Sequence, residues 1–323
     1  MAISLRCTAA ARTAAQVNSR MKQWMSFISK VYFLLLLSAC LLYPIGCNLS
    51  EELDNNQKII VAVTIAPQKE FVEAIGGDRV EALLMVPPGA SPHTYEPTPG
   101  QLSKLEKAKV YAKVGSGVEF ELAWLDNLLS LNTDMLVVDC SRDIALQKIT
   151  APHIEDHQND QNGNLDPHIW LSPANARIMA GNITQGLIQV DPANKSYYED
   201  NRDEYLSRLI ALENEINDSL SSITTRIFMV YHPAWGYFAS SFNLTMIPVE
   251  EEGKTPTPAG LAHLIDQAKE YKIKIVFVSP QYSIQSAEVI AAEIGGTVVL
   301  IDPLAEDYID NLRSVAAEMA KVM

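Results

Sequence analysis

Eight short runs rich in β-branched residues, separated by longer amphipathic stretches, constrain the fold of this chain most strongly. The runs are Ile59–Ile65, Val80–Val86, Val110–Val114 and Met135–Asp139 in the first half, and Ile227–Tyr231, Leu244–Pro248, Ile275–Ser279 and Val298–Ile301 in the second. Strands that alternate with helical patterns are typical of βαβ units and of a largely parallel sheet. The sequence therefore predicts an α/β protein with four strands in each half.

A stretch without a strand signal, residues 174–223, separates the two halves. Large apolar residues recur in it at helical spacing, namely Tyr198, Tyr205, Leu209, Leu212, Ile216 and Leu220. The Asp191-Pro192 step interrupts the pattern, so we expect one helix before it and one long helix from about Pro192 to about Ser221. The alternative is an ordinary helix that packs on one domain only.

These patterns predict two α/β lobes with mainly parallel four-stranded sheets, joined by one long linking helix. The predicted boundaries are 58–191 for the N-terminal lobe, 192–222 for the linking helix and 223–323 for the C-terminal lobe.

The first 39 residues have the pattern of an export signal. They contain five Lys or Arg and no acid, and they end in the apolar segment Val31–Ala39, which is too short to span a bilayer comfortably. The sequence Leu-Ser-Ala-Cys at 37–40 resembles a bacterial-type lipobox. We therefore expect a signal peptide over 1–39, lipid attachment at Cys40 and a lipid-anchored tether over 40–57.

Three alternatives for this leader stay open. An uncleaved anchor would continue the apolar run, Cys47 is a second candidate for the lipidated residue, and Met21 and Met25 are alternative start residues. In every case we expect the body to be exported, either to the periplasm or to the outer face of the cytoplasmic membrane.

Charge and motifs exclude several classes of function. The chain has 25 Lys plus Arg against 39 Asp plus Glu, a net charge of −14, which argues against a nucleic-acid partner. No G-x-G-x-x-G follows a predicted strand, and neither a P-loop nor a G-x-S-x-G elbow is present. Cys140, the one cysteine of the body, is expected to be a small buried apolar residue.

Three of the six histidines lie beside prolines, at the ends of apolar or strand-like runs: His93, His168 and His232. Asp302 likewise follows a predicted strand and precedes a proline. Ligands of open α/β sheets bind beyond the carboxyl ends of the strands, so convergence of these side chains in one cleft is reasonable. They are 75, 64 and 70 residues apart, so only the fold can bring them together.

Four motifs carry a specific resemblance. They are GASPHTYEPTP at 89–99, DPHIWLSP at 166–173, YHPAWGYF at 231–238 and LIDPL at 300–304. In this order they resemble the metal-binding solute-binding proteins of zinc and manganese ABC transporters, the ZnuA/TroA-like family, over essentially residues 58–323.

The resemblance implies two lobes bridged by one long helix, with a metal ion buried between them. Position by position, His93, His168, His232 and Asp302 resemble the four metal ligands of the family. It further implies delivery of the metal to a membrane permease powered by a cytoplasmic ATPase, without catalysis. We expect a monomer that is held at the membrane by its lipid anchor.

The ligand set favours zinc. Three imidazoles and one carboxylate suit tetrahedral Zn²⁺, whereas Mn²⁺ prefers more oxygen ligands. In the family a carboxylate in place of His232 usually marks the manganese branch, so this chain resembles the zinc branch. Pro92 stands where some zinc members carry an extra glutamate, which leaves the fourth contact to Asp302 or to water. Manganese remains the alternative, since most histidine-rich sites bind Zn²⁺ better than Mn²⁺ in any case.

Other polar features are less specific. The polar segment 152–163 carries His153, Asp156 and His157 and resembles a shortened form of the family's zinc-collecting loop, with an ordinary solvated loop as the alternative. His263 is expected to be structural. The acidic run that begins at Glu250 is either solvated or hydrogen-bonded to the free ring nitrogen of a ligand histidine.

Two rival functions follow from the same residues. A zinc-dependent hydrolase would hold the metal with three histidines and use Glu96 or Asp302 as base, but the H-E-x-x-H helix typical of many such enzymes is absent. A surface protein that retains the fold for cell adhesion is the second rival.

Overall fold

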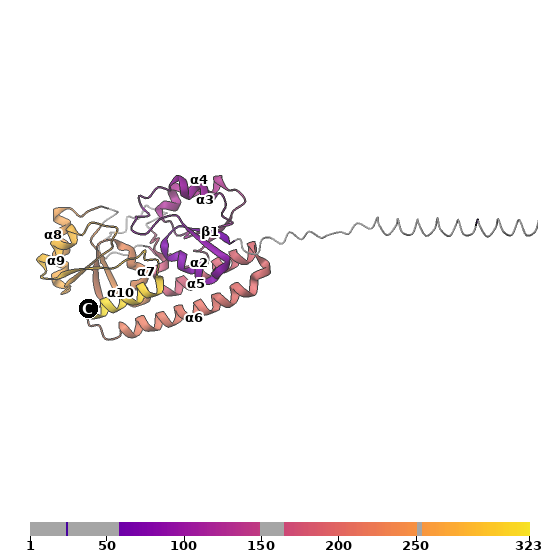
Figure 1. The fold of residues 1–323 in the computed structure, drawn as a ribbon. Coiled ribbons are helices and arrows are strands. Elements are labelled where there is room, and N and C mark those ends of the chain that lie inside the picture. The colour runs from indigo at the N-terminus through magenta and orange to yellow at the C-terminus, as the bar shows by residue number, and fades with distance from the viewer. Residues whose placement is uncertain (1–23, 25–57, 149–164, 251–253) are drawn as a thin grey trace, which may run out of the picture. The chain divides into compact units, whose positions relative to one another are not determined.

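The structure is a computed structural model of the chain (Figure 1). It describes residue 24 and residues 58–148, 165–250 and 254–323. The predicted signal peptide and tether, including Cys40 and Cys47, lie outside the described residues, apart from residue 24. The segment with His153, Asp156 and His157 also lies outside them. Within the described ranges, no helix combines the length and the apolar character needed to cross a bilayer.

The first half of the body forms one parallel sheet with the strand order β2-β1-β3-β4. Its strands are β1 (Ile59–Val63), β2 (Val80–Leu84), β3 (Val110–Lys113) and β4 (Leu136–Asp139), and α2 (Ala66–Gly76), α3 (Pro99–Leu105) and α4 (Glu119–Leu131) connect them. Register pairs Val61 with both Ala82 and Val110. The central strands β1 and β3 are mostly buried, as expected for apolar strands with neighbours on both sides.

The second half repeats the topology with the order β6-β5-β7-β8, again fully parallel. Its strands are β5 (Ile227–Val230), β6 (Thr245–Pro248), β7 (Ile275–Val278) and β8 (Thr297–Leu300), and its connecting helices include α7 (Gly236–Ser241), α8 (Pro258–Glu270) and α9 (Gln285–Glu293). The predicted α/β fold with two four-stranded parallel sheets is confirmed. Strand ends differ from the predicted ranges by one or two residues.

Helix α6 (Lys195–Ser219) is the long helix expected between the two halves. It begins three residues later than predicted, because Pro192–Asn194 forms a separate 3₁₀ turn after α5 (Pro173–Val190). The apolar side chains that recur along α6 are buried, as their spacing predicts. They pack against α5 and α2 on the N-terminal side and against α10 (Tyr308–Val322) on the C-terminal side (Figure 1). The long helix therefore contacts both lobes.

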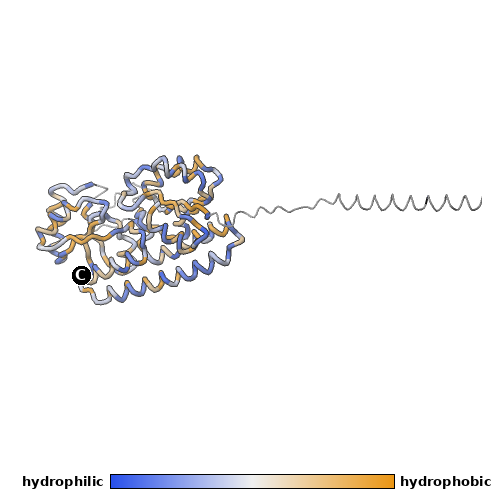
Figure 2. Tube along the Cα trace, viewed as in Figure 1, coloured by the Kyte–Doolittle hydropathy of each residue, from blue (hydrophilic) through white to orange (hydrophobic). Residues whose placement is uncertain are grey.

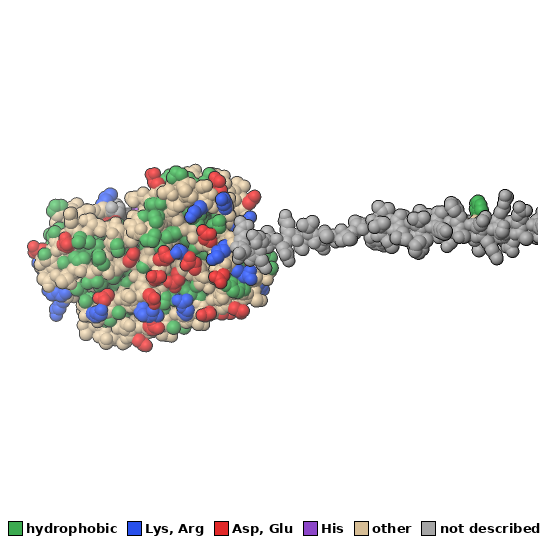
Figure 3. All heavy atoms as spheres, in the orientation of Figure 1, with side chains coloured by type: hydrophobic (Ala, Val, Ile, Leu, Met, Phe, Trp, Pro, Cys, Tyr) green, Lys and Arg blue, Asp and Glu red, His purple; other side chains and the backbone are tan. Residues whose placement is uncertain are grey.

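Ion pairs reinforce the outer surface of this helix layer. Arg177 of α5 contacts Glu213 of α6 at 2.5 Å, and Arg313 of α10 contacts Glu215 of α6 at 2.7 Å. Figure 3 shows acidic and basic side chains interspersed over the same face. Ion pairs near the surface contribute little individually, so packing rather than charge holds the layer.

One hydrophobic core extends through both lobes. It contains the first sheet, the buried faces of α5, α6 and α10, and one side of the second sheet, including Phe228 and Phe277. A smaller cluster lies between the other side of the second sheet and helices α8 and α9. Cys140 is fully buried in the main core, as expected. Figure 2 shows the apolar strands running through the interior of each lobe.

Candidate metal centre

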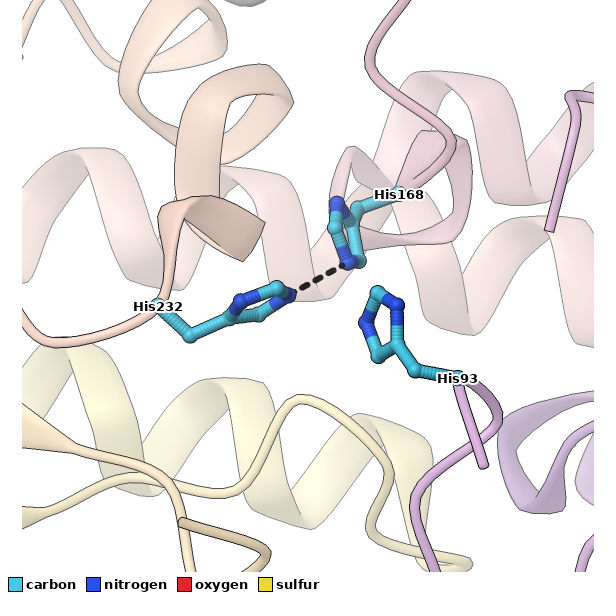
Figure 4. Close-up of side chains that lie close together, drawn as sticks. All are labelled: His93, His168 and His232. Carbon is cyan, nitrogen blue, oxygen red and sulfur yellow. Dashed lines mark hydrogen bonds between the residues drawn. The ribbon is translucent and has the colours of Figure 1, made fainter. Parts of the chain in front are cut away.

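Three histidines from three distant loops meet in the structure (Figure 4). His93 lies between β2 and α3, His168 directly precedes the 3₁₀ turn Ile169–Leu171 before α5, and His232 follows β5. One ring nitrogen of each lies within 4.8 Å of the other two. The Nε2 atoms of His168 and His232 are 3.3 Å apart. The structure therefore brings together the three histidines that the sequence singled out.

The local sequence explains why these side chains point inward. Pro233 begins a short turn directly after His232, and Ser172 caps α5 by accepting a hydrogen bond from the Asn175 N–H. The 3₁₀ turns Ile169–Leu171 and Pro233–Trp235 thus begin directly after His168 and His232. His168 and His232 are each only 7% exposed, while 27% of the His93 side chain is exposed. His93 thus forms the outer wall of the centre.

A carboxylate contacts the Nδ1 atom of every histidine in the centre. The distances are 2.9 Å from His93 to Glu119 Oε1, 2.8 Å from His168 to Asp166 Oδ1 and 3.2 Å from His232 to Glu250 Oε2. A neutral imidazole that donates Nδ1–H to a carboxylate keeps its lone pair on Nε2. The three Nε2 atoms are therefore all available as metal ligands.

This arrangement leaves lone pairs facing one another. With Nδ1–H donated outward, the Nε2 atoms of His168 and His232 would both be acceptors at 3.3 Å. Two acceptors at that distance repel unless a proton or a cation lies between them. The chemistry of the donor set thus fits a bound cation.

The sequence indicated only some of the three carboxylates that contact the histidines. It placed Glu250 in a charge run and allowed a carboxylate partner without choosing one, and it gave Asp166 no role. The signal for Asp166 was local, since it stands two residues before His168. Glu119 is the first residue of α4 and is 26 residues from His93, and nothing in the sequence indicated it.

The surroundings of His93 and His232 shift the pKa values of these two histidines in opposite directions. Burial lowers the pKa of His232 to about 4, although the hydrogen bond to Glu250 acts in the opposite direction. Burial also disfavours protonated His93, but the hydrogen bond and charge of Glu119, with the charge of Glu250, outweigh it and raise the pKa of His93. The pKa of Glu119 is lowered because its contact with His93 outweighs its burial. His232 is therefore neutral and ready to bind a metal, while protons compete for His93.

The histidines line a pocket together with Trp170, Gln281 and Tyr282. The ring of Tyr282 stacks on His232, with centroids 4.6 Å apart and planes 19° apart. Tyr282 also forms a hydrogen bond with Ser91, two residues before His93. Residues from both lobes thus enclose the centre.

Asp302 follows β8 and has hydrogen-bond partners of its own. Its Oδ1 accepts hydrogen bonds from Gln281 Nε2 at 3.0 Å and from the Leu304 N–H at 2.9 Å. Among the described residues, the group of ligand atoms within 4.8 Å of one another consists of the three histidines and does not include Asp302. Its role as fourth ligand therefore stays a proposal.

Two further residues of the sequence analysis lie away from the pocket walls. Glu96, the alternative base of the hydrolase hypothesis, is exposed, and His263 is exposed on α8. Neither lines the pocket.

The comparison with known families agrees with the geometry. Residues 61–322 match the family model described as ZnuA, the periplasmic component A of the zinc-uptake complex. The chain belongs to this family. It is therefore a solute-binding protein of a transport system rather than a member of an enzyme family.

Relatives and solved structures support the same placement. The chain is 28% identical to the high-affinity zinc uptake system protein ZnuA of Bacillus subtilis, over 84% of this chain and 88% of that protein. A crystal structure of ZnuA is 40% identical, with a TM-score of 0.76, over 82% of this chain and 99% of the other. The laminin-binding protein of Streptococcus agalactiae shares the fold at 23% identity over 82% of this chain and 99% of that one, with a TM-score of 0.72.

Proposed function

We propose that this protein captures Zn²⁺ between its two lobes outside the cytoplasmic membrane and delivers it to an ABC permease driven by a cytoplasmic ATPase. The observation that carries the proposal is the convergence of three imidazoles, each with a carboxylate in contact with its Nδ1 atom. Carboxylates in this position fix the ring orientation and raise the basicity of metal-binding imidazoles. Membership of the zinc-uptake family supports the same conclusion.

The donor set favours zinc over manganese. The carboxylates of Glu119, Asp166 and Glu250 contact the histidines at Nδ1, so the atoms that converge are imidazole nitrogens. A tetrahedral Zn²⁺ accepts three imidazoles and one oxygen, whereas Mn²⁺ favours more oxygen ligands. Asp302 or a water completes the site. A related protein, a ZnuA deletion mutant 40% identical to this chain over 82% of this chain and 98% of that one (TM-score 0.76), has a crystal structure with zinc bound.

The proposal is tested by competition titration with a zinc chelator on His93→Ala, His168→Ala and His232→Ala. Each variant should lose most of the zinc affinity, because removal of one of three nitrogen ligands leaves an incomplete tetrahedron. His263→Ala is the matched control, since His263 is exposed on α8 and does not line the pocket. If two of the three site variants bind zinc like the parent, the assignment is wrong.

Elemental analysis of the purified protein identifies the metal independently. Zinc at one equivalent per chain supports the proposal, and manganese at one equivalent under metal-replete growth contradicts it. Titration of the parent with Mn²⁺ gives the ratio of the two affinities.

We also propose that the segment with His153, Asp156 and His157 collects zinc for the main site. The double variant His153→Ala/His157→Ala should bind zinc at equilibrium nearly as tightly as the parent and load it more slowly. A loss of affinity comparable to that of His168→Ala would instead place this segment in the main site.

The proposed attachment to the membrane rests on the lipobox-like sequence before Cys40. Metabolic labelling with a radioactive fatty acid should mark the parent and the Cys47→Ala variant but not Cys40→Ala. Labelling lost only in Cys47→Ala would move the modification to the second cysteine.

A further inference from the structure

Gln281 lines the metal pocket, yet the four-ligand hypothesis gives it no role. It lies in the loop between β7 and α9, next to Tyr282, which stacks on His232. Its side chain links the pocket to Asp302, because Nε2 donates a hydrogen bond to Asp302 Oδ1 at 3.0 Å. An ionised carboxylate only accepts hydrogen bonds, so this contact fixes which end of the amide is the nitrogen.

The other end of the same amide has no partner. Gln281 Oε1 is buried and accepts no hydrogen bond from the described residues. A buried carbonyl oxygen without a donor is destabilising, so native proteins usually satisfy such an atom with a protein donor or an ordered water. A water bound to a metal ion in this pocket is a suitable donor, because the cation makes its O–H groups more acidic.

Asp302 is held from two sides. Gln281 Nε2 and the Leu304 N–H both bind Oδ1, and the Asn311 side chain binds the Asp302 backbone carbonyl at 2.7 Å. Asp302 does not line the pocket, whereas Gln281 does. Of the two side chains, Gln281 and Asp302, the Gln281 amide is therefore the one that reaches the metal pocket.

We propose that Gln281 controls the fourth coordination position: Nε2 restrains the Asp302 carboxylate, and Oε1 accepts a hydrogen bond from a water bound to the metal. The ion then meets three imidazoles and the oxygen of that water, while the restrained Asp302 carboxylate stays off the ion. Restricting the oxygen ligands to one favours four-coordinate Zn²⁺ over Mn²⁺. Gln281 is thus a positioning and specificity-determining residue, and this inference rests on the proposed zinc-binding function.

The test compares Gln281→Met, which has a similar length but no hydrogen-bonding group, with Gln281→Glu, which is isosteric and adds a carboxylate. Gln285→Met is the matched control, because Gln285 is exposed at the start of α9. Zinc affinity, manganese affinity and the visible absorption of the Co²⁺-loaded protein are measured for each. Cobalt absorbs strongly in four-coordinate sites and weakly in six-coordinate ones.

Gln281→Met should bind zinc about 10–100-fold more weakly than the parent, the usual effect of losing a group that orients metal ligands. Gln281→Glu should lower the ratio of zinc to manganese affinity about tenfold and weaken the cobalt absorption, because a second carboxylate offers the ion more oxygen. Gln285→Met should match the parent in all three measurements.

A double-mutant cycle separates positioning from general structural damage. If Gln281 acts through Asp302, the effect of Gln281→Met should shrink in an Asp302→Asn background. The inference would be overturned if the effects of Gln281→Met and Asp302→Asn on zinc affinity were fully additive. It would also be overturned if both single Gln281 variants matched the parent in zinc affinity, metal ratio and cobalt spectrum. In either case the proposed zinc capture would stand. Failure of zinc capture itself gives a different result, since the parent and His168→Ala would then bind zinc equally and both proposals would fall.

Discussion

At the scale of single residues, the centre is a set of histidine and carboxylate pairs rather than three isolated imidazoles. Glu119 has the clearest consequence, because its contact with His93 raises the pKa of that histidine. His232, with a pKa of about 4, stays neutral at any pH near neutrality. Of these two histidines, His93 at the exposed edge of the centre is therefore the one at which protons compete with a bound metal.

This difference predicts the pH dependence of zinc binding. The proposed zinc site needs neutral His93, and a raised pKa means that protonation of His93 begins at a higher pH. Affinity should therefore fall as the pH drops through the raised pKa of His93, with no contribution from His232 until near pH 4. Chelator competition from pH 8 to pH 5 measures the profile. A flat profile over this range would contradict the assignment of His93 as a ligand.

Glu119→Gln should alter that profile in two ways. Zinc affinity at pH 8 should fall about 10–100-fold, because the ring of His93 loses the carboxylate that orients it. The decline with acid should move to lower pH, since burial then dominates and lowers the pKa of His93. Glu96→Gln, an exposed residue of the same loop as His93, is the control and should match the parent. An unchanged midpoint in Glu119→Gln would exclude the proposed pairing.

At the scale of elements, the site is made by loops at the carboxyl ends of parallel strands. His93, His232 and Gln281 follow β2, β5 and β7, and Asp302 follows β8. The Glu250 N–H donates to the Tyr231 carbonyl at 2.9 Å, which ties the loop after β6 to the loop that carries His232. The parallel topology therefore places these residues at the carboxyl edges of the two sheets, one edge from each lobe.

This arrangement explains what the sequence could predict. The β-branched runs indicated both sheets, and the prolines beside the histidines indicated the loops, because both signals are local. Strand ends were less accurate, since residues such as Ile65 and Val86 are as buried as the strands they follow. The pairing of His93 with Glu119 depends on how α4 packs beside the β2–α3 loop, and no local pattern encodes that packing.

Helix α4 owes its position to a second glutamate. Glu121 accepts hydrogen bonds from the Thr64 hydroxyl at 2.5 Å and from the Val114 and Gly115 N–H groups at 2.6 and 2.9 Å. Its side chain lies in the protein interior and joins the ends of β1 and β3 to the first turn of α4. The same turn carries Glu119.

Glu121→Gln should lower the free energy of unfolding by about 1–3 kcal/mol. The glutamine can place its amide NH₂ group only where the carboxylate accepted a hydrogen bond, so a buried donor then faces another donor. Urea unfolding measures the change, and Glu106→Gln is the control because Glu106 is exposed. Stability equal to that of the parent would show that the carboxylate does not anchor α4.

At the scale of the whole molecule, contacts between the lobes are built into the site. The indole N–H of Trp170 donates to the Pro303 carbonyl at 2.7 Å, and the Tyr308 hydroxyl donates to the Trp170 carbonyl at 2.7 Å. Lys69 of α2 pairs with Glu306 on the C-terminal side. Since the main core also extends through both lobes, we expect the two sheets to unfold together.

Trp170→Phe tests this coupling between the lobes. The phenyl ring retains most of the apolar contact but leaves the Pro303 carbonyl without its donor, at a cost of about 1–3 kcal/mol. Zinc affinity should fall as well, because Trp170 contacts His168 through its ring and holds the loop that leads from Asp302. Trp124→Phe is the control, since Trp124 lies on α4 at the edge of the core.

Thermal unfolding followed by far-ultraviolet circular dichroism, with and without zinc, gives both quantities. The parent should show one main transition, and zinc at 100 times its dissociation constant should stabilise it by about 2.7 kcal/mol. In Trp170→Phe the midpoint temperature of unfolding without zinc should fall. The same zinc concentration should also raise the stability of this variant by less than it raises that of the parent. If the variant loses stability but keeps the full response to zinc, the contact between the lobes supports the fold without shaping the metal site. If it instead shows two separate transitions while the parent shows one, this single hydrogen bond couples the lobes more strongly than the shared core does.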